Sequence, residues 1–331
     1  LARKLLQRGM VSGRLRLPAV PALLEAYVEL CRTIARSLNI PPTTDTEPQL
    51  RAQLRQSLEA AFQGSPRSWV VISYEAVIEG MIRVAVEVEA PPLASTYDGW
   101  VGNTGGHPFG LHADARVLNL ASAAADPAQW PVLDLGAGTG RNALALARRG
   151  HPVDAVELSG QLAQILRSEA AREGLPIRVL VRDLLATRAD LRRDYRLIVL
   201  SGVASDFRGT GELRALLEMA AACLVSGGQL VFNLFLACDG YEPDAAAREL
   251  GLQLYTALFT RAELAAAVAD LPLQLVSDTS VHDYEHEHLP AEAWPPTPWY
   301  ANWTRGLDLF GGAEGQRPPI EMRWLVWEQQ G

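Results

Sequence analysis

The sequence contains one lysine, Lys4, so nearly all of its 30 basic residues are arginine. A chain without an internal lysine has no Walker-type phosphate loop and no side chain that forms a Schiff base. Cysteine is also scarce: Cys31, Cys223 and Cys238 are odd in number and widely spaced, which indicates neither a disulfide framework nor a zinc knuckle. These absences fit a protein of the reducing cytoplasm, and we expect that location.

Long apolar runs and an excess of positive charge are missing as well. No run reaches the roughly 18 apolar residues that span a bilayer, so we expect no membrane partner. The formal net charge of −8 disfavours a nucleic-acid partner, because phosphate binding requires positive charge. Hydrophobic residues make up 48% of the 331 residues, which is enough to bury a core.

The first 70 residues differ in charge from the rest, with ten basic and five acidic side chains. The spacing of apolar residues and the chain-breaking prolines and glycines predict four elements in this part of the chain. They are helices over 19–38 and 47–63, and strands over Trp69–Tyr74 and Met81–Val88. Gly80 between the strands favours an antiparallel hairpin, and Pro91 with Pro92 marks a boundary. We therefore predict an accessory domain of two helices and a β-hairpin over residues 1–92, suited to homodimerisation or to peptide recognition.

From residue 130 onward, short apolar strands alternate with helical segments. The expected strands are Val132–Leu135, Val153–Glu157, Ile177–Val181, Leu197–Leu200, Leu230–Phe235, Leu273–Val276 and Ile320–Trp327. The expected helices fill 140–149, 160–173, 211–224 and 261–270. Such alternation is typical of an α/β fold, here a doubly wound, mostly parallel, seven-stranded sheet in a domain over residues 93–331. An irregular, aromatic-rich insertion over 278–318 interrupts this domain and is expected to bind the acceptor.

A glycine-rich turn follows the first of these strands, where segment 132–142 reads VLDLGAGTGRN. Glycines let a ligand approach the backbone closely, and the helix that follows offers free N–H groups. A dinucleotide fingerprint would place its third glycine where Arg141 stands, whereas this turn has glycines at 136, 138 and 140. With Asp134 two residues before it, the turn resembles motif I of the class I S-adenosylmethionine (SAM) methyltransferases.

The resemblance implies a SAM site. In that family an acid at the end of the second strand, here Glu157, accepts hydrogen bonds from both ribose hydroxyls. Asp183, at the end of the third strand, matches the acid that accepts from the adenine amino group, and a helix N-cap is its alternative role. The cofactor-binding residues implied are Asp134, Gly136, Ala137, Gly138, Gly140, Arg141, Asn142, Glu157, Leu158, Asp183, Leu184 and Ser201. Within the family, the chain resembles the tellurite-resistance and thiopurine-like small-molecule methyltransferases.

Methyl transfer from a sulfonium requires that the nucleophile and the methyl group be held in line and that water be excluded. A general base is needed only where the acceptor keeps its proton at neutral pH. Asp206, which follows the fourth strand, is a candidate base or a loop cap. His282 and His286 are the other candidate bases.

Three segments are candidates for the acceptor pocket. Tyr97 and Trp100 precede the core, where they fit either a lid that packs on the sulfonium or ordinary packing. Segment His282–His288 combines three histidines with three acids, and it fits a strand or loop that lines the pocket, a metal site or a solvated loop. Segment 294–303, rich in proline and aromatic residues, fits acceptor contacts, a structural plug or an oligomer contact. The predicted substrate-binding residues are Tyr97, Trp100, Ser205, Tyr284, Trp299, Tyr300 and Asn302, and no bound metal is expected.

These observations predict a SAM-dependent methyltransferase that methylates an oxygen, nitrogen or sulfur atom of a small molecule or peptide by in-line displacement. Two other functions fit the same residues: a catalytically idle SAM-binding scaffold, and an NAD-dependent oxidoreductase. Binding of NAD but not SAM would favour the oxidoreductase, and SAM binding without methyl transfer would favour the scaffold.

Overall fold

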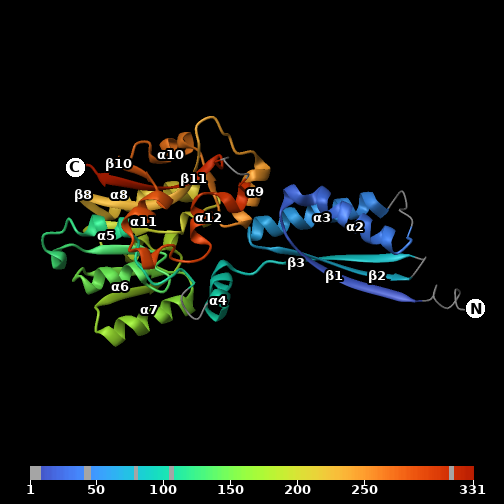
Figure 1. Ribbon diagram of the computed structural model, residues 1–331, viewed down its shortest axis with the longest axis horizontal. Helices are drawn as coiled ribbons and strands as arrows, with labels where there is room; N and C mark the ends of the chain where they lie inside the picture. The colour runs from blue at the N-terminus through green and yellow to red at the C-terminus, as the bar shows by residue number, and fades with distance from the viewer. Residues whose placement is uncertain (1–8, 41–45, 78–80, 104–107, 313–316) are drawn as a thin grey trace, which may run out of the picture. The chain divides into compact units, whose positions relative to one another are not determined.

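The structure of the protein is a computed structural model, which describes residues 9–40, 46–77, 81–103, 108–312 and 317–331. The chain divides into two compact units (Figure 1). The first unit comprises Leu1–Leu93 and Asp244–Gln253, and the second comprises Ala94–Pro243 and Leu254–Gly331. The short segment after Pro243 therefore belongs with the N-terminal unit, which the sequence did not predict.

The first unit is a three-stranded antiparallel sheet with two helices packed on one face (Figure 1). Its elements are β1 (Met10–Pro18), η1 (Pro21–Leu23), α2 (Leu24–Ser37), α3 (Thr46–Gly64), β2 (Trp69–Val77), β3 (Ile82–Glu89) and α9 (Ala245–Gln253). Strands β2 and β3 form the predicted hairpin, and β1 pairs with the other side of β2. The sequence reading missed β1, and Gly80 lies outside the described residues.

The core of this unit lies between the sheet and its helices. Val70 and Ile72 of β2 pack with Leu54 and Leu58 of α3 and with Val28 of α2, and none of these five side chains is more than 1% exposed. Because side chains alternate along a strand, only one face of β2 contributes to this cluster. The apolar residues that recur at helical spacing in α2 and α3, as the sequence predicted, fill this core.

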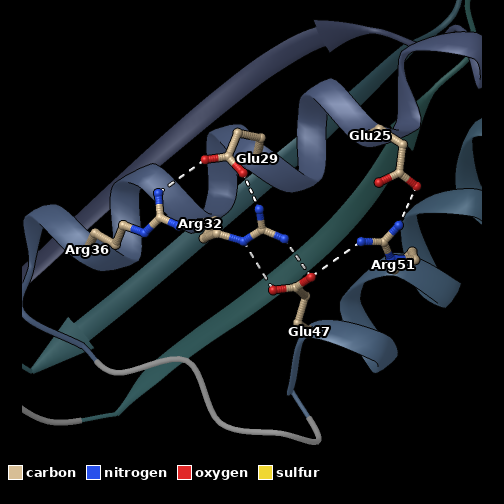
Figure 2. A network of polar contacts seen from close by, with 6 residues as sticks. All are labelled: Glu25, Glu29, Arg32, Arg36, Glu47 and Arg51. Carbon is tan, nitrogen blue, oxygen red and sulfur yellow. Dashed lines mark hydrogen bonds and ion pairs between the residues drawn. The ribbon is translucent and has the colours of Figure 1, made fainter.

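Arginines and glutamates connect α2 and α3 on their outer surface (Figure 2). Arg32 of α2 donates to Glu47 of α3 at 2.7 Å and also pairs with Glu29 on its own helix. Arg51 of α3 pairs with Glu47 at 3.3 Å and with Glu25 of α2. Ion pairs at a solvent-exposed surface contribute little stability one by one, so we attribute the stability of this unit mainly to its apolar core.

The second unit is built on one sheet with the strand order β10-β11-β8-β7-β4-β5-β6, and the two-residue strand β9 pairs with β8. The strands are β4 (Val132–Leu135), β5 (Val153–Glu157), β6 (Ile177–Val181), β7 (Tyr195–Leu200), β8 (Leu224–Ala237), β9 (Leu258–Phe259), β10 (Leu273–Ser280) and β11 (Ile320–Gln329). Strands β4 to β8 are parallel to one another, and β9 is parallel to β8. Strand β11 is antiparallel to both β8 and β10. The predicted doubly wound sheet is confirmed, with β9 as an additional eighth strand.

Helices cover both faces of this sheet: in Figure 1, α6 and α7 lie below the strands and α10 lies above them. The α-helices are α4 (Leu93–Asn103), α5 (Ala115–Ala121), α6 (Arg141–Arg148), α7 (Gly160–Glu173), α8 (Thr210–Cys223), α10 (Arg261–Val268), α11 (Val281–His288), α12 (Tyr300–Thr304) and α13 (Leu307–Phe310). The short 3-10 turns are η2 (Pro127–Gln129), η3 (Leu184–Ala186), η4 (Arg188–Asp190), η5 (Ala204–Asp206) and η6 (Ala291–Ala293). No helix in the described part of the chain has the length and apolar character needed to cross a membrane.

The insertion between β10 and β11 is more ordered than the sequence indicated. Its histidine-rich part was expected as a strand or loop, and the structure shows helix α11 instead. The Ser280 hydroxyl accepts a hydrogen bond from the Asp283 backbone N–H at 3.2 Å, which caps the helix. Val281 and Glu285, one turn apart, are its buried residues, so the polar residues that suggested a loop occupy its outer faces.

Candidate functional site

The glycine-rich loop between β4 and α6 lies where the strand order reverses, between β4 and β7. Open α/β sheets bind ligands at this switch point, beyond the carboxyl ends of the strands. Gly136 and Gly140 have φ values of 71° and 92°, in the left-handed region that favours glycine. A Cβ on Gly136 would lie 2.3 Å from a methyl group of Val203, and one on Gly140 would lie 2.3 Å from Leu166. The turn therefore depends on glycine for both conformation and space.

Asp134 lies inside the sheet directly below this loop and is 2% exposed. Its Oδ2 atom has no hydrogen-bond partner among the described residues. Burial raises the pKa of Asp134 to about 7, against the opposing charge of Arg141. A buried carboxylate oxygen without a donor costs free energy, so a ligand donor bonded to this atom would remove that cost.

Glu157 ends β5 beside the same loop and is 5% exposed. Its Oε2 accepts from the Gly138 backbone N–H at 2.8 Å, and its Oε1 accepts from the Ser159 N–H at 2.7 Å. Burial raises the pKa of Glu157, and these backbone donors oppose that rise. A carboxylate has about four acceptor positions, so the fixed Glu157 carboxylate keeps part of its capacity for ligand hydroxyls beside the backbone donors of Gly138, Leu158 and Ser159.

Arg141 and Asn142, the first two residues of α6, both bind Asp114. Arg141 donates to the two Asp114 oxygens at 2.5 and 2.9 Å and to the Ser201 hydroxyl at 3.1 Å. Asn142 donates to Asp114 at 2.9 Å and accepts from its backbone N–H at 2.9 Å. The sequence reading placed Arg141, Asn142 and Ser201 at the site but missed Asp114, whose one signal is its position directly before a helix.

Glu285 is a second acid that the sequence did not single out, although it lies in the histidine-rich segment that the sequence did. Its side chain is fully buried and accepts from the backbone N–H groups of Ala115 at 2.7 Å and Arg116 at 3.1 Å. It also accepts from the Trp324 indole at 3.0 Å. Burial, followed by the charge of Asp114, raises the pKa of Glu285 to about 7. One carboxylate thus joins α11, the start of α5 and β11.

The acid predicted to contact adenine lies at the surface. Asp183 is exposed and accepts from the Leu185 N–H at 2.9 Å, which is the capping geometry that the sequence left open. Leu158 and Leu184 are half-buried at the ends of β5 and β6. The role of Asp183 towards adenine stays a prediction.

Helix α4 and the loop after it carry aromatic rings that pack together near the glycine-rich loop and η5. Trp100 packs 5.4 Å from Tyr97, 5.8 Å from Phe109 and 5.0 Å from Tyr255, measured between ring centroids. The Tyr97 hydroxyl donates to the carboxylate of Asp206 in η5. Phe109 also lies against the glycine-rich loop. The structure thus brings three of the predicted residues, Tyr97, Trp100 and Asp206, together in one cluster; part of this segment, residues 104–107, lies outside the described residues.

The two candidate histidine bases lie in a different cluster. His282 and His286 stack at 6.0 Å on one face of α11, and both pack against Trp294, at 5.2 and 5.1 Å. Asp206, in contrast, belongs to the cluster around α4. Within the described ranges no group of three or more histidine, cysteine, aspartate or glutamate side chains is arranged to hold a metal ion.

The other predicted acceptor residues are spread over the unit. Tyr284 stacks on His288 at 4.1 Å, with the Arg116 guanidinium 4.8 Å from the centre of its ring. The Ser205 hydroxyl donates into its own turn, to a carbonyl 3.0 Å away. Trp299 and Asn302 are exposed. Tyr300, in contrast, is buried.

The charge around the loop indicates which kind of cofactor fits it. Among the described residues, the acids that interact with one another around this site are Asp98, Asp114, Asp134, Glu157 and Glu285, and the basic group that interacts with them is Arg141. Such a site favours a cation and disfavours the pyrophosphate of a dinucleotide. SAM carries a sulfonium and an ammonium, and its ribose hydroxyls match the free lone pairs of Glu157. The unpartnered oxygen of Asp134 and the turn that only glycine allows complete the fit.

Asp134 gives this site a testable pH dependence. A folded-state pKa near 7, above the ordinary value of 3.8, means that the free energy of unfolding falls as pH rises from about 4 to about 7. The uncharged amide in the variant Asp134→Asn mimics the protonated acid, so its free energy of unfolding should not fall in this pH range. Without cofactor, we expect the free energy of unfolding of the variant minus that of the wild type to be about 2 kcal/mol larger at pH 8 than at pH 5. Urea denaturation at both pH values measures this, and parallel profiles for the two proteins would contradict it. Glu285 titrates in both proteins and cancels in the comparison.

Comparisons with known proteins point to the same loop. A family model described as a methyltransferase domain matches residues 132–228, which run from β4 into β8. A ubiquinone biosynthesis O-methyltransferase of Xanthomonas axonopodis pv. citri (strain 306) is 28% identical over 197 residues. That alignment covers 53% of this chain and 75% of the relative.

Two solved structures share the fold. A geranyl diphosphate methyltransferase in complex with SAM has a TM-score of 0.50 and 15% identity, over 65% of this chain and 84% of that chain. The [4+2]-cyclase SpnF has a TM-score of 0.50 and 14% identity, over 72% of this chain and 95% of that chain. Identities this low support a common fold and no transfer of substrates.

Proposed function

Since the chain is a class I SAM-dependent methyltransferase, we propose that it methylates an oxygen, nitrogen or sulfur atom of a small molecule with an apolar, planar surface. SAM supplies an electrophilic methyl group, and the displaced sulfur keeps the electron pair of the broken bond. Glu157 holds the ribose, while the loop at Gly136 to Gly140 and the start of α6 hold the rest of the cofactor. Asp134 supplies its free oxygen to a cofactor donor.

The observation that carries the acceptor proposal is the aromatic cluster of α4 over η5. Tyr97, Trp100, Phe109 and Tyr255 offer ring surface and no charge, which suits a planar apolar acceptor and excludes water from the reacting atoms. Peptides generally need an extended groove with backbone hydrogen-bond partners. A small molecule is therefore the acceptor that this cluster supports.

Asp206 is the proposed proton acceptor, with Tyr97 as its positioning partner. The Tyr97 hydroxyl donates to the Asp206 carboxylate, which fixes the acid at the end of the strand beside the glycine-rich loop. An acceptor hydroxyl or thiol must lose its proton for a neutral methylated product to form, and an ammonium must lose one proton before its nitrogen can attack the methyl group. A carboxylate at this place can take that proton. Nothing in the described residues supports the expected homodimer, and we do not propose it.

The proposal is tested in two steps with the purified full chain. Calorimetry with SAM, S-adenosylhomocysteine (SAH) and NAD comes first, and radiolabelled methyl transfer to the small-molecule and peptide fractions of a lysate comes second. We expect SAM binding and label in the small-molecule fraction. Label confined to peptides would refute the acceptor class, and SAM binding without transfer to either fraction would favour the idle scaffold. The methyl-transfer step is needed because the same fold also serves a cyclase.

The variant Asp206→Asn should lower kcat about tenfold and leave the affinity for SAH unchanged, because Asp206 acts on the acceptor. The loss should shrink as pH rises, since an acceptor that ionises by itself no longer needs a base. Asp239→Asn, at an exposed acid in the turn after β8, is the matched control. An unchanged kcat for Asp206→Asn across the pH range would remove Asp206 from the reaction.

A further inference from the structure

The segment that carries α12 packs against two parts of the cofactor site. A Cβ on Gly110, in the loop before α5, would lie 2.7 Å from the carbonyl oxygen of Pro296. The Trp303 indole donates to the Tyr255 carbonyl at 2.8 Å, and its ring edge lies 3.9 Å from the Cβ position of Gly202, in the turn after β7. The insertion therefore covers the end of β7, next to the glycine-rich loop.

Tyr300 and Thr297 are the buried residues of this segment whose hydroxyls lack a hydrogen-bond partner among the described residues, and Tyr300 is the larger and less exposed of the two. It is 6% exposed, and its hydroxyl has no hydrogen-bond partner among the described residues. The rings of Trp294, Trp299 and Trp303 surround its own ring at 5.8 to 6.5 Å. A buried hydroxyl without a partner costs free energy, so a ligand group that bonded to it would gain that cost back.

The charged groups that act on the Tyr300 hydroxyl come from the start of α5, the start of α6 and the middle of α11. Asp114, Glu285 and Arg141 all interact with it electrostatically. Burial raises the pKa of Tyr300 well above its ordinary value, so the phenol stays neutral and can both donate and accept. Arg141 already donates to Asp114, Ser201 and a backbone carbonyl, so little of its hydrogen-bonding capacity remains for a ligand.

We propose that the Tyr300 hydroxyl binds the amino-acid end of SAM, the ammonium and carboxylate of its methionine part, and not the methyl acceptor. A zwitterion needs a partner that donates to its carboxylate or accepts from its ammonium, and a neutral phenol does both. Trp303, on the same short helix as Tyr300, packs against Gly202, and the neighbouring Ser201 accepts from Arg141 at 3.1 Å, whereas the acceptor residues Tyr97 and Asp206 form a separate contact. This inference rests on the proposed function, and it makes the insertion part of the cofactor site.

The test compares two ligands that differ only at the amino-acid end. SAH carries the ammonium and carboxylate, whereas 5′-methylthioadenosine lacks both. We expect Tyr300→Phe to weaken SAH binding about tenfold in calorimetry and to leave methylthioadenosine binding within about twofold of wild type. Because the lost hydroxyl has no partner in the protein, the ligand-free variant should melt at the wild-type temperature or slightly above. Tyr27→Phe, which removes a phenol that donates to Pro18 in the first unit, is the control and should leave both affinities unchanged.

Each alternative outcome overturns the inference. Unchanged SAH affinity, or an equal loss of affinity for both ligands, would show that Tyr300 does not bind the amino-acid end. Unchanged SAH affinity with a raised KM for the acceptor would place Tyr300 in the acceptor pocket. If wild-type protein binds neither ligand, the proposed function fails, and that result is distinguishable because it appears before any variant is made.

Discussion

The variant Glu157→Ala is expected to bind SAM and SAH at least 100-fold more weakly than wild type. Hydrogen bonds to a charged group are worth about 1.5–3 kcal/mol each, and this carboxylate is proposed to accept two from the ribose. The same substitution removes the acceptor for the Gly138 N–H at 2.8 Å, which fixes the middle of the glycine-rich loop. Calorimetry with SAH measures the loss, and the melting temperature without ligand shows whether the fold survives.

A second glutamate on the adjacent helix provides the control for this experiment. Glu173, at the end of α7, pairs with Arg148 at 2.6 Å on the surface. Glu173→Ala therefore removes a carboxylate of the same kind without touching the loop, and its SAH affinity should equal that of wild type. Glu157→Gln keeps the shape and one acceptor oxygen, so its affinity for SAH should lie between that of Glu157→Ala and that of wild type. Wild-type affinity in Glu157→Ala would place the cofactor elsewhere in the protein.

The parts of this structure that sequence reading predicted are those that depend on local pattern. Strands β4, β5 and β6 begin and end at the predicted residues, because each is a short, mostly apolar run between clear breakers. The glycine-rich turn was recognisable for the same reason, since its spacing and the preceding Asp134 are adjacent in sequence. Glu157 followed from the length of one βαβ unit.

The parts that sequence reading missed depend on contacts between distant residues. Asp114 and Arg141 meet across 27 positions, and Glu285 meets the start of α5 across about 170. No local pattern distinguishes Glu285 from Glu287 in the same acidic segment, although one is buried and the other exposed. Strand β1 was missed because its outward residues are charged or small, and its pairing partner lies some 60 residues further along.

The buried carboxylate of α11 carries the second large prediction. Glu285→Ala should lower the free energy of unfolding by about 3 kcal/mol at pH 6, because it leaves the N–H groups of Ala115 and Arg116 and the Trp324 indole without an acceptor inside the protein. Glu287→Ala, two residues further along the same helix and exposed, should cost almost nothing. Urea denaturation of the three proteins measures both values.

The pH dependence of this loss has a defined sign. The folded-state pKa of Glu285, about 7, lies above the ordinary value of 4.5, so the folded wild type holds a proton that the unfolded chain has lost. Its contribution to stability is therefore greatest at low pH and declines as pH rises towards 7. The difference in free energy of unfolding between wild type and Glu285→Ala should therefore become smaller from pH 5 to pH 8. The same difference for Glu287→Ala should not change with pH. A gap that widens with pH would mean that the ionised form of Glu285 is the one that the fold favours, and that its three donors outweigh its burial.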